Sequence, residues 1–493
     1  MHDDEIKRGR DAWARLRFAV VGPLLAAPPR RGELEDEIAR LAEKSWRHPR
    51  SGEPVRFGRS TIERWLAVAR RSRDPVAALG RAVRRDAGEQ PSLSLRLRQL
   101  VREQHEEHPS WTVRLHYDNL LARLAGGAEV GSVPSYQSVR RFMQAQGLHR
   151  VRRVRRRAGS AAGHHPHPSS EREIRSYEVA HTHALWHADF HHGSHQVLSA
   201  DGSWATPRLL GFLDDHSRLC CHLQWYLEET AECFVHGLGQ AILKRGLPRA
   251  LLTDNGAAML AAETTEGLGR LGIVHERTLA YAAYQNAKQE VFWAQVEGRL
   301  VAMLEGVPDL TLARLNEATQ AWVELEYHRH VHRELATTPL ARYLGASTLG
   351  RPSPSPEELR RAFRAETVRT QRRSDGTISL LGRRFEVPAR LRHLGRIHLR
   401  YAGWDLSSVD VVDRRTGEIL TPLYPLDKRA NASGRRRRVA APAAPSACAS
   451  DPPASGMAPL LAELLAEYSA SGLPPAYLPK EAPTKDEKDE EEK

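Results

Sequence analysis

The sequence predicts a multidomain protein in which two helical modules precede an α/β domain and a small β-barrel. Three observations lead to this prediction. Apolar residues recur at helical spacing through most of 11–148, short apolar runs alternate with helical patterns over 181–345, and brief alternating runs between Gly and Asp turns fill 368–425. A chain of 493 residues is long enough for about three or four domains.

The first helical module is predicted at 1–90. Ser60 followed by Glu63 predicts a capping box at the start of a helix. The polar side of this helix carries Arg59 and Arg64, which suits the recognition helix of a helix-turn-helix unit that binds DNA. An ordinary amphipathic helix would show the same pattern.

The second helical module, at 91–148, repeats the arrangement. Ser135 is the expected cap of its last helix, and Arg140 and Arg141 lie on the exposed side of that helix. Two such modules in tandem predict a longer DNA site than one module alone would read.

A basic arm and linker are predicted at 149–180. Like charges at this density, followed by Gly, Ser and Pro, form no core. Either the arm is simply solvated, or it follows DNA phosphates or a minor groove, which we favour. Six arginines lie close together here: Arg150, Arg152, Arg153, Arg155, Arg156 and Arg157.

The predicted α/β domain, at 181–345, places three carboxylates near one sheet. Asp189 lies within the first strand and Asp254 ends the fourth, while Glu290 follows Asp254 with 35 residues between them. Glu290 shares a helix face with Trp293, so we expect it to point toward the sheet. Because neighbouring buried carboxylates repel, a pair of Mg²⁺ or Mn²⁺ ions is the expected partner.

Other polar residues in the same domain have competing interpretations. Asp214 and Asp215 stand between two apolar runs, as expected of a hairpin turn. Glu297 is the alternative third ligand, and His187 either contacts the site or fills space. Nine histidines between 164 and 195 would allow zinc, but they lack cysteines and a clear ligand spacing.

The motifs WHADF with Asp189, LTDNGAAM with Asp254 and YQNAKQE with Glu290 resemble those of the DDE transposases and integrases. The resemblance is to enzymes with a retroviral-integrase-like (RNase H-like) core, especially the bacterial insertion-sequence and phage Mu-like branch. It implies a DNA transposase that acts as a homo-oligomer on double-stranded DNA, cleaves the 3′ ends of its element and transfers them to a target. A DNA-binding regulator derived from a transposase and a metal-dependent nuclease that does not join DNA remain as alternatives.

Two departures from the family pattern concern residues near Glu290. Ala283 and Ala287 stand where Pro and Gly are common. Many members also carry a basic residue seven positions after the glutamate, where this chain has Glu297. We therefore expect Lys288 or Arg299 to make the corresponding phosphate contact.

The C-terminal part begins with a linker and helix at 346–367, followed by the predicted barrel at 368–428. A mostly disordered tail is predicted at 429–493, with a short amphipathic helix at 457–468. The tail has no evident core to join, so the apolar stripe of this short helix is either a chance patch or the face by which the helix docks on a partner. By resemblance, that partner is an AAA+ ATPase. The stripe consists of Leu460, Leu461, Leu464, Leu465 and Tyr468.

The composition agrees with a DNA-directed protein. The net charge is +12 and the pI about 9.7, which favours an acidic polymer as partner. No uncharged apolar stretch is long enough to span a membrane, and the N-terminus lacks the apolar core of a secretion signal. Four cysteines without a CxxC pair argue against a disulfide framework. These features predict a cytoplasmic protein and, with the resemblance, one associated with a bacterial nucleoid.

Overall fold

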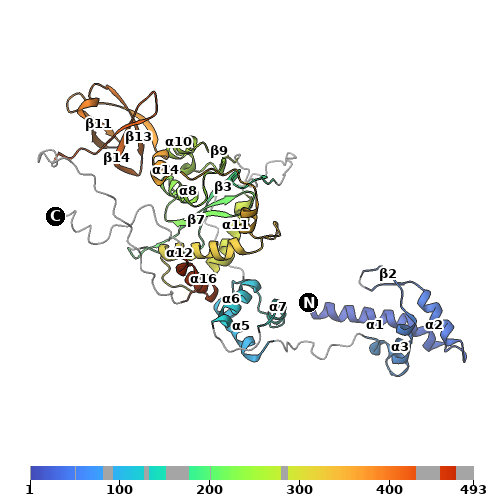
Figure 1. Cartoon of the computed structure of the whole chain (residues 1–493). Coiled ribbons are helices and arrows are strands. Elements are labelled where there is room, and N and C mark those ends of the chain that lie inside the picture. The colour runs from blue at the N-terminus through green and yellow to red at the C-terminus, as the bar shows by residue number, and fades with distance from the viewer. Residues whose placement is uncertain are drawn as a thin grey trace, which may run out of the picture. The chain divides into compact units, whose positions relative to one another are not determined.

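A computed structural model describes residues 2–49, 51–80, 93–126, 133–151, 177–199, 201–278, 287–428 and 456–472. The chain divides into two compact units, Met1–Pro91 and Ser92–Lys493, which are described separately (Figure 1). No described helix is both long enough and apolar enough to cross a membrane.

The first unit consists of helices around a small apolar core. These are α1 (His2–Ala26), α2 (Leu34–Glu43), α3 (Arg59–Arg70) and α4 (Pro75–Ala78). The hairpin of β1 (Trp46–Arg47) and β2 (Pro54–Val55) lies between α2 and α3. The connection between α2 and α3 is therefore longer than the short turn that usually joins the two helices of a helix-turn-helix.

The predicted capping box at Ser60 is wrong. The N-cap of α3 is Gly58, whose carbonyl accepts hydrogen bonds from the N–H groups of Thr61 and Ile62. Because the extended backbone ends at Gly58, Ser60 already lies in the first turn of the helix and cannot cap it.

The second unit begins with three helices, α5 (Leu95–Glu107), α6 (Val113–Ala125) and α7 (Tyr136–Ala145). Each starts at a Ser or Thr whose hydroxyl accepts a hydrogen bond from the backbone three residues on. The predicted cap at Ser135 is confirmed, with the N–H of Ser138 as donor at 3.2 Å.

One mixed sheet forms the centre of the second unit, as predicted. Its strands are β3 (Leu185–His192), β6 (Arg208–Asp214), β7 (Cys220–Tyr226), β8 (Ala250–Thr253) and β9 (Val274–Arg277), in the order β7-β6-β3-β8-β9. A second small pairing joins β4 (Val197–Leu198) to β5 (Trp204–Ala205). Strand β3 is antiparallel to β6 and parallel to β8.

Helices cover both faces of this sheet. Helices α8 (Ala231–Arg245), α9 (Ala257–Leu260), α10 (Ala262–Arg270) and α14 (Pro356–Ala362) share a core with Leu210 and Phe212 of β6. On the other face, Leu209 and Leu213 pack with α11 (Ala287–Gln295), the π-helical η2 (Val296–Val301), α12 (Leu312–Ala321) and η3 (Trp322–Glu326). The turn η4 (Tyr327–Arg329) and helix α13 (Pro339–Gly345) follow. Alternate residues of one strand thus serve two cores.

The C-terminal strands do not form the predicted closed barrel within the described residues. Strands β10 (Ala365–Thr370), β13 (Arg396–Ala402), β14 (Asp405–Val412) and β15 (Ile419–Leu423) make an antiparallel sheet. Strands β11 (Thr377–Leu380) and β12 (Arg383–Glu386) form a separate hairpin, and the turn η5 (Ala389–Leu391) follows. Both pieces share one apolar core. An alternating sequence shows that one strand face is buried, but not whether the sheet closes.

The last described helix, α16 (Pro459–Ala470), packs against α6, α12 and η3 of its own chain. The side chains of Leu461, Leu464, Leu465 and Tyr468 are buried there, and Leu460 is partly buried. The expectation that this stripe has no core to join is therefore wrong. The periodicity predicted the helix correctly, but it does not identify the surface that receives it.

Candidate active site

Strands β3 and β8 bring Asp189 and Asp254 to the same edge of the sheet. Their parallel register pairs His187 with Leu252, so Asp189 and Asp254 each lie two residues beyond a paired position. Because side chains alternate along a strand, both carboxylates lie on the same face. The Oδ1 atom of Asp254 also accepts a hydrogen bond from the N–H of Gly256 at 2.9 Å, which fixes the turn after β8.

The electrostatics of this pair are unfavourable without a cation. The pKa of Asp189 is raised to about 6, mainly by burial; the negative charge of Asp254 also raises it, while a hydrogen bond from Trp293 opposes both effects. Two neighbouring oxygen ligands in such a position have the chemistry that Mg²⁺ or Mn²⁺ prefers. The residues present therefore fit a divalent cation.

Glu290 lies in the first turn of α11, on the same face of the sheet, but its side chain is exposed. The expectation that it points inward is wrong, because the buried stripe of α11 runs through Gln289, Phe292 and Trp293 and leaves Glu290 beside it. Within the described residues, no three His, Cys, Asp or Glu side chains lie close enough together to hold a metal ion. The structure thus brings two members of the triad together and leaves the third at the edge.

Trp293, one turn after Glu290, contacts the site directly. Its Nε1–H donates to Oδ2 of Asp189 at 3.3 Å. A Cβ atom on Gly211, which pairs with Asp189 across β3 and β6, would lie 2.6 Å from the Cη2 atom of the indole. On another side the imidazole of His191 stacks on the indole, with 5.5 Å between ring centroids. A glycine within a buried strand is the sequence signal that could have revealed this close approach.

Glu297, the alternative third ligand, has other partners. Its Oε1 atom lies 2.9 Å from Nε2 of His191 and 3.2 Å from the backbone nitrogen of Ser194. Burial by itself would raise the pKa of Glu297, but the hydrogen bonds from His191 and Ser194 outweigh it and lower the pKa. Glu297 therefore supports the ring that stacks on Trp293.

The two aspartates of the predicted hairpin differ in role. Asp214 accepts a hydrogen bond from the N–H of Ser217 at 2.9 Å and so forms the expected turn. Asp215 is fully buried, contacts Nε2 of His187 at 2.7 Å, and forms an ion pair with Lys288. Burial alone would raise the pKa of Asp215, yet its hydrogen bonds with His187 and Lys288 hold that pKa well below the usual range. His187 is thereby assigned to this internal network.

Both basic residues expected to replace the missing phosphate contact are engaged within the protein. Lys288 pairs with Asp215 and also lies 4.4 Å from the ring centroid of Tyr177. Arg299 forms ion pairs with Asp118, at 2.8 Å, and with Glu326. Neither is free in this structure to bind DNA, because each neutralises a carboxylate that is fully or mostly buried.

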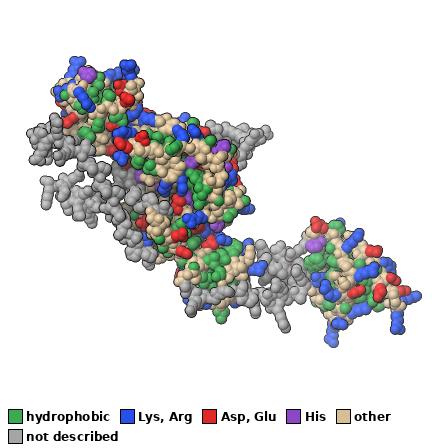
Figure 2. Space-filling view, viewed as in Figure 1, with side chains coloured by type: hydrophobic (Ala, Val, Ile, Leu, Met, Phe, Trp, Pro, Cys, Tyr) green, Lys and Arg blue, Asp and Glu red, His purple; other side chains and the backbone are tan. Residues whose placement is uncertain are grey.

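Five of the arginines predicted to bind DNA lie within the described residues, and all five are exposed. Arg59 and Arg64 lie on α3, and Arg140 and Arg141 lie on α7; none of the four has an ion pair with a described residue. Figure 2 shows Lys and Arg side chains spread over the visible face of the first unit. Arg150, by contrast, donates from Nε to the carbonyl of Ser110 at 2.7 Å. The remaining predicted arm residues, Arg152, Arg153, Arg155, Arg156 and Arg157, lie outside the described residues, as do three of the nine histidines considered for zinc, His164, His165 and His167.

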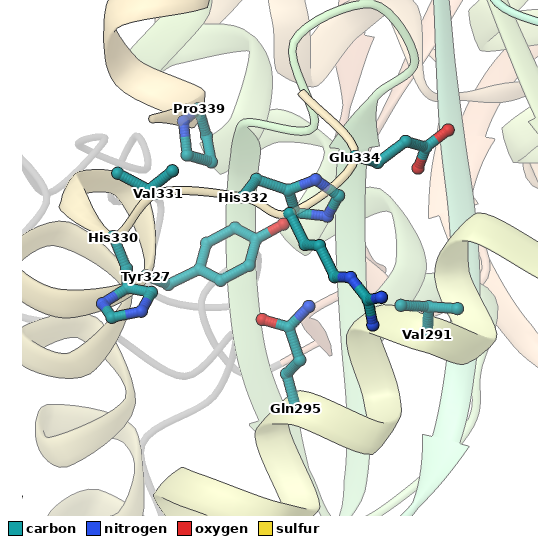
Figure 3. Close-up of a pocket in the computed structure, with 9 residues that line it drawn as sticks. Val291, Gln295, Tyr327, His330, Val331, His332, Glu334 and Pro339 are labelled. Atoms are coloured by element: carbon teal, nitrogen blue, oxygen red, sulfur yellow. The ribbon is translucent and has the colours of Figure 1, made fainter. Parts of the chain in front are cut away.

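A pocket of about 530 Å³ opens beside α11 (Figure 3). Val291 and Gln295 of this helix line it, together with Tyr327 and His332. Arg333 also lines the pocket, is exposed, and forms no ion pair within the part of the chain that the structure describes. No sequence pattern predicted this pocket, because its two walls come from segments more than 30 positions apart.

Neither a protein-family model nor a curated protein matches the sequence. Among solved structures, the chain is similar to the HTLV-2 integrase catalytic core domain in complex with magnesium (20% identity, TM-score 0.28), covering 34% of this chain and 99% of that one. It is also similar to the catalytic core domain of BIV integrase (20%, 0.26), covering 33% and 94%. A third similar structure is a chain of the simian T-cell lymphotropic virus intasome in complex with PP2A regulatory subunit B56 gamma (14% identity, TM-score 0.31). The match covers 62% of this chain and 95% of that one. Likeness at this level assigns neither a family nor an activity.

We expect Asp189→Asn to stabilise the metal-free protein at neutral and alkaline pH. Because the pKa of Asp189 is raised from 3.8 to about 6, its protonated form favours folding below pH 3.8, and this contribution is lost as the pH rises through about 6. A neutral Asn avoids that loss, so the free energy of unfolding should rise by about 1–3 kcal/mol near pH 8. Urea unfolding with a chelator present measures it. An equal gain near pH 4 would contradict the electrostatic explanation.

We expect Trp293→Phe to weaken Mn²⁺ binding by roughly tenfold, because groups that orient a metal ligand usually matter by that factor or more. Calorimetric titration of the full chain with Mn²⁺ measures the change. Trp322→Phe is the matched control, since Trp322 is also buried but its Nε1 has no hydrogen-bond partner among the described residues. Equal losses in both variants would show that Trp293 only fills space.

Proposed function

We propose that this protein is a DDE-type DNA transposase with an RNase H-like core, which cleaves the 3′ ends of its element and joins them to target DNA. One observation carries the proposal: Asp189 and Asp254 lie together just beyond the paired part of the parallel strands β3 and β8, at an electrostatic cost that a divalent cation would remove. A structural role would not require that cost.

Each site residue has a distinct part in this proposal. Asp189 and Asp254 would hold two Mg²⁺ or Mn²⁺ ions, and Glu290 would complete the set from α11. When bound, such ions neutralise phosphate charge and activate the attacking oxygen. Trp293 orients Asp189 through its indole N–H, while Gly211 and His191 hold the indole in place.

The same centre would serve both reactions of a transposase. A water molecule would first hydrolyse a phosphodiester and free a 3′-hydroxyl. That hydroxyl would then attack a phosphodiester of the target DNA in one transesterification step, in which the new bond to phosphorus forms as the target strand's own 3′-oxygen leaves. No covalent enzyme intermediate is needed, so the protein does not have to supply a nucleophilic side chain. The exposed guanidinium of Arg333, in the pocket beside α11, is the basic group we place near the DNA, since Lys288 and Arg299 are engaged elsewhere.

DNA binding is assigned to the helical modules. The exposed arginines of α3 and α7 are suited to phosphate and base contacts, and the arm at 149–180 would add nonspecific attraction. A homo-oligomer on DNA would let two ends react together. The protein would then work in the cytoplasm, at the nucleoid of a bacterium.

A metal-dependent nuclease that cuts without joining is the second candidate, because the paired carboxylates would serve that reaction equally well. Supplying pre-cleaved ends together with a plasmid target separates the two, since only a transposase would give joined products. A DNA-binding regulator derived from a transposase would give neither cleaved nor joined DNA.

Substitution of any of the three carboxylates should abolish strand transfer, while binding to the ends changes by less than about twofold. Each of Asp189→Asn, Asp254→Asn and Glu290→Gln removes a metal ligand without touching the helical modules. Gel-based assays of joined products and of end binding measure both properties. Glu228→Gln, at an exposed carboxylate of the same domain, is the control. Residual transfer above a few per cent would remove that residue from the triad.

The double substitution of Arg140 and Arg141 to Ala should weaken binding to DNA ends and reduce the slope of log affinity against log salt by about two, because each arginine would neutralise one phosphate. Fluorescence anisotropy at several salt concentrations measures this slope. Arg123→Ala serves as the control, because Arg123 is already paired with Glu107 at 3.2 Å. An unchanged slope would place the DNA-binding surface elsewhere.

A further inference from the structure

The surface that receives α16 belongs to two different parts of the second unit. Leu461 and Leu465 of α16 share an apolar core with Trp111 and Leu115 of the second helical module and with Trp322 after α12. Helix α16 contacts α6 of the module as well as α12 and η3 beside the sheet. Helix α16 therefore packs between the second helical module, a candidate for DNA binding, and the helices of the α/β domain.

Polar and backbone contacts fix α16 in one position. The N–H of Leu460 donates to Oδ1 of Asn119 on α6 at 3.0 Å. The N–H of Ala458 donates to the carbonyl of Met303 at 3.2 Å. Gly306 lies so close to Gly456 that a Cβ atom on Gly306 would be 2.5 Å from the carbonyl oxygen of Gly456. An arbitrary apolar segment would not make these contacts, so the surface is specific for α16.

The module also contacts the far end of the helical segment that carries Glu290. Helix α11 continues directly into η2, and the residues just beyond η2 meet the module. The indole of Trp111 donates to the carbonyl of Ala302 at 2.9 Å, and the hydroxyl of Ser110 donates to Glu305 at 2.9 Å. Arg299, within η2, pairs with Asp118 of α6. One continuous helical segment thus has a catalytic candidate at its start and this joint at its end.

We propose that α16 is an internal clamp that holds the second helical module on the end of the Glu290 helix, so that DNA-end binding is coupled to the placement of Glu290. The coupling rests on the proposed function, whereas the clamp itself does not. The clamp also replaces the expected contact of an ATPase with Leu461 and Leu465. If these leucines bound a partner, their substitution would leave end cleavage intact. If they form the clamp, their substitution impairs end cleavage.

The clamp is tested on the full chain carrying a site-specific protease site inserted between residues 440 and 445. After cleavage, we expect the fragment with α16 to co-elute with the rest of the chain in gel filtration. Leu461→Glu with Leu465→Glu should release the fragment, while the control Glu463→Gln, on the exposed side of α16, should not. Release of the unsubstituted fragment would overturn the clamp, whatever the protein does.

The coupling is tested with the uncut chain. Leu461→Glu with Leu465→Glu should lower end cleavage and strand transfer by about tenfold or more, with end binding within about twofold of the unsubstituted chain. Equal activity in both chains would overturn the coupling. Should the double variant fail to fold, Gly306→Ala, whose added Cβ atom would have Gly456 as its nearest neighbour, provides the second comparison and should lower cleavage and transfer in the same direction. Absence of cleavage and transfer in the unsubstituted chain would instead refute the proposed function, and co-elution would still decide the clamp.

Discussion

The parallel pairing of β3 with β8 is the constraint on which the rest of the site depends. It places Asp189 and Asp254 side by side on one face of the sheet. Two carboxylates in that position repel each other, and Asp189 is held at a raised pKa mainly because it is buried. A protein that needed only a stable sheet would place apolar residues there. A cation bound between the two carboxylates would offset their repulsion.

The helical segment that packs on this face, α11 with η2, is held in place by contacts at two points along its length. Near its start, Trp293 donates to Asp189 and is confined by Gly211 and His191. At its end, the joint with the second helical module fixes its path through Trp111 and Arg299. The π-helical segment η2 contains Arg299 and lies between Trp293 and Ala302, the acceptor of the Trp111 hydrogen bond, and such irregular turns are frequent at functional sites. The position of Glu290 therefore depends on packing at both ends of the helical segment.

The basic side chains Lys288 and Arg299 near the site form ion pairs within the protein. Lys288 neutralises Asp215, and Arg299 neutralises Asp118 and Glu326, so neither contributes to the surface field. Removing one partner of such a pair would leave an uncompensated charge in a poorly solvated place. The basic residues that remain exposed on α3, on α7 and in the pocket beside α11 are the ones suited to polymer binding.

The sequence by itself determined the class of the sheet, most helices and the two paired aspartates, because these depend on local periodicity and on strand ends. It also indicated the stripe of α16, but an apolar stripe states only that one face is buried and not against what. Tertiary structure alone decided that Leu461 packs within its own chain, that Lys288 is paired, and that the described C-terminal strands form a four-stranded sheet and a separate hairpin in place of the predicted barrel. It also decided the exposed place of Glu290, since the rotation of a helix is set by all of its contacts together.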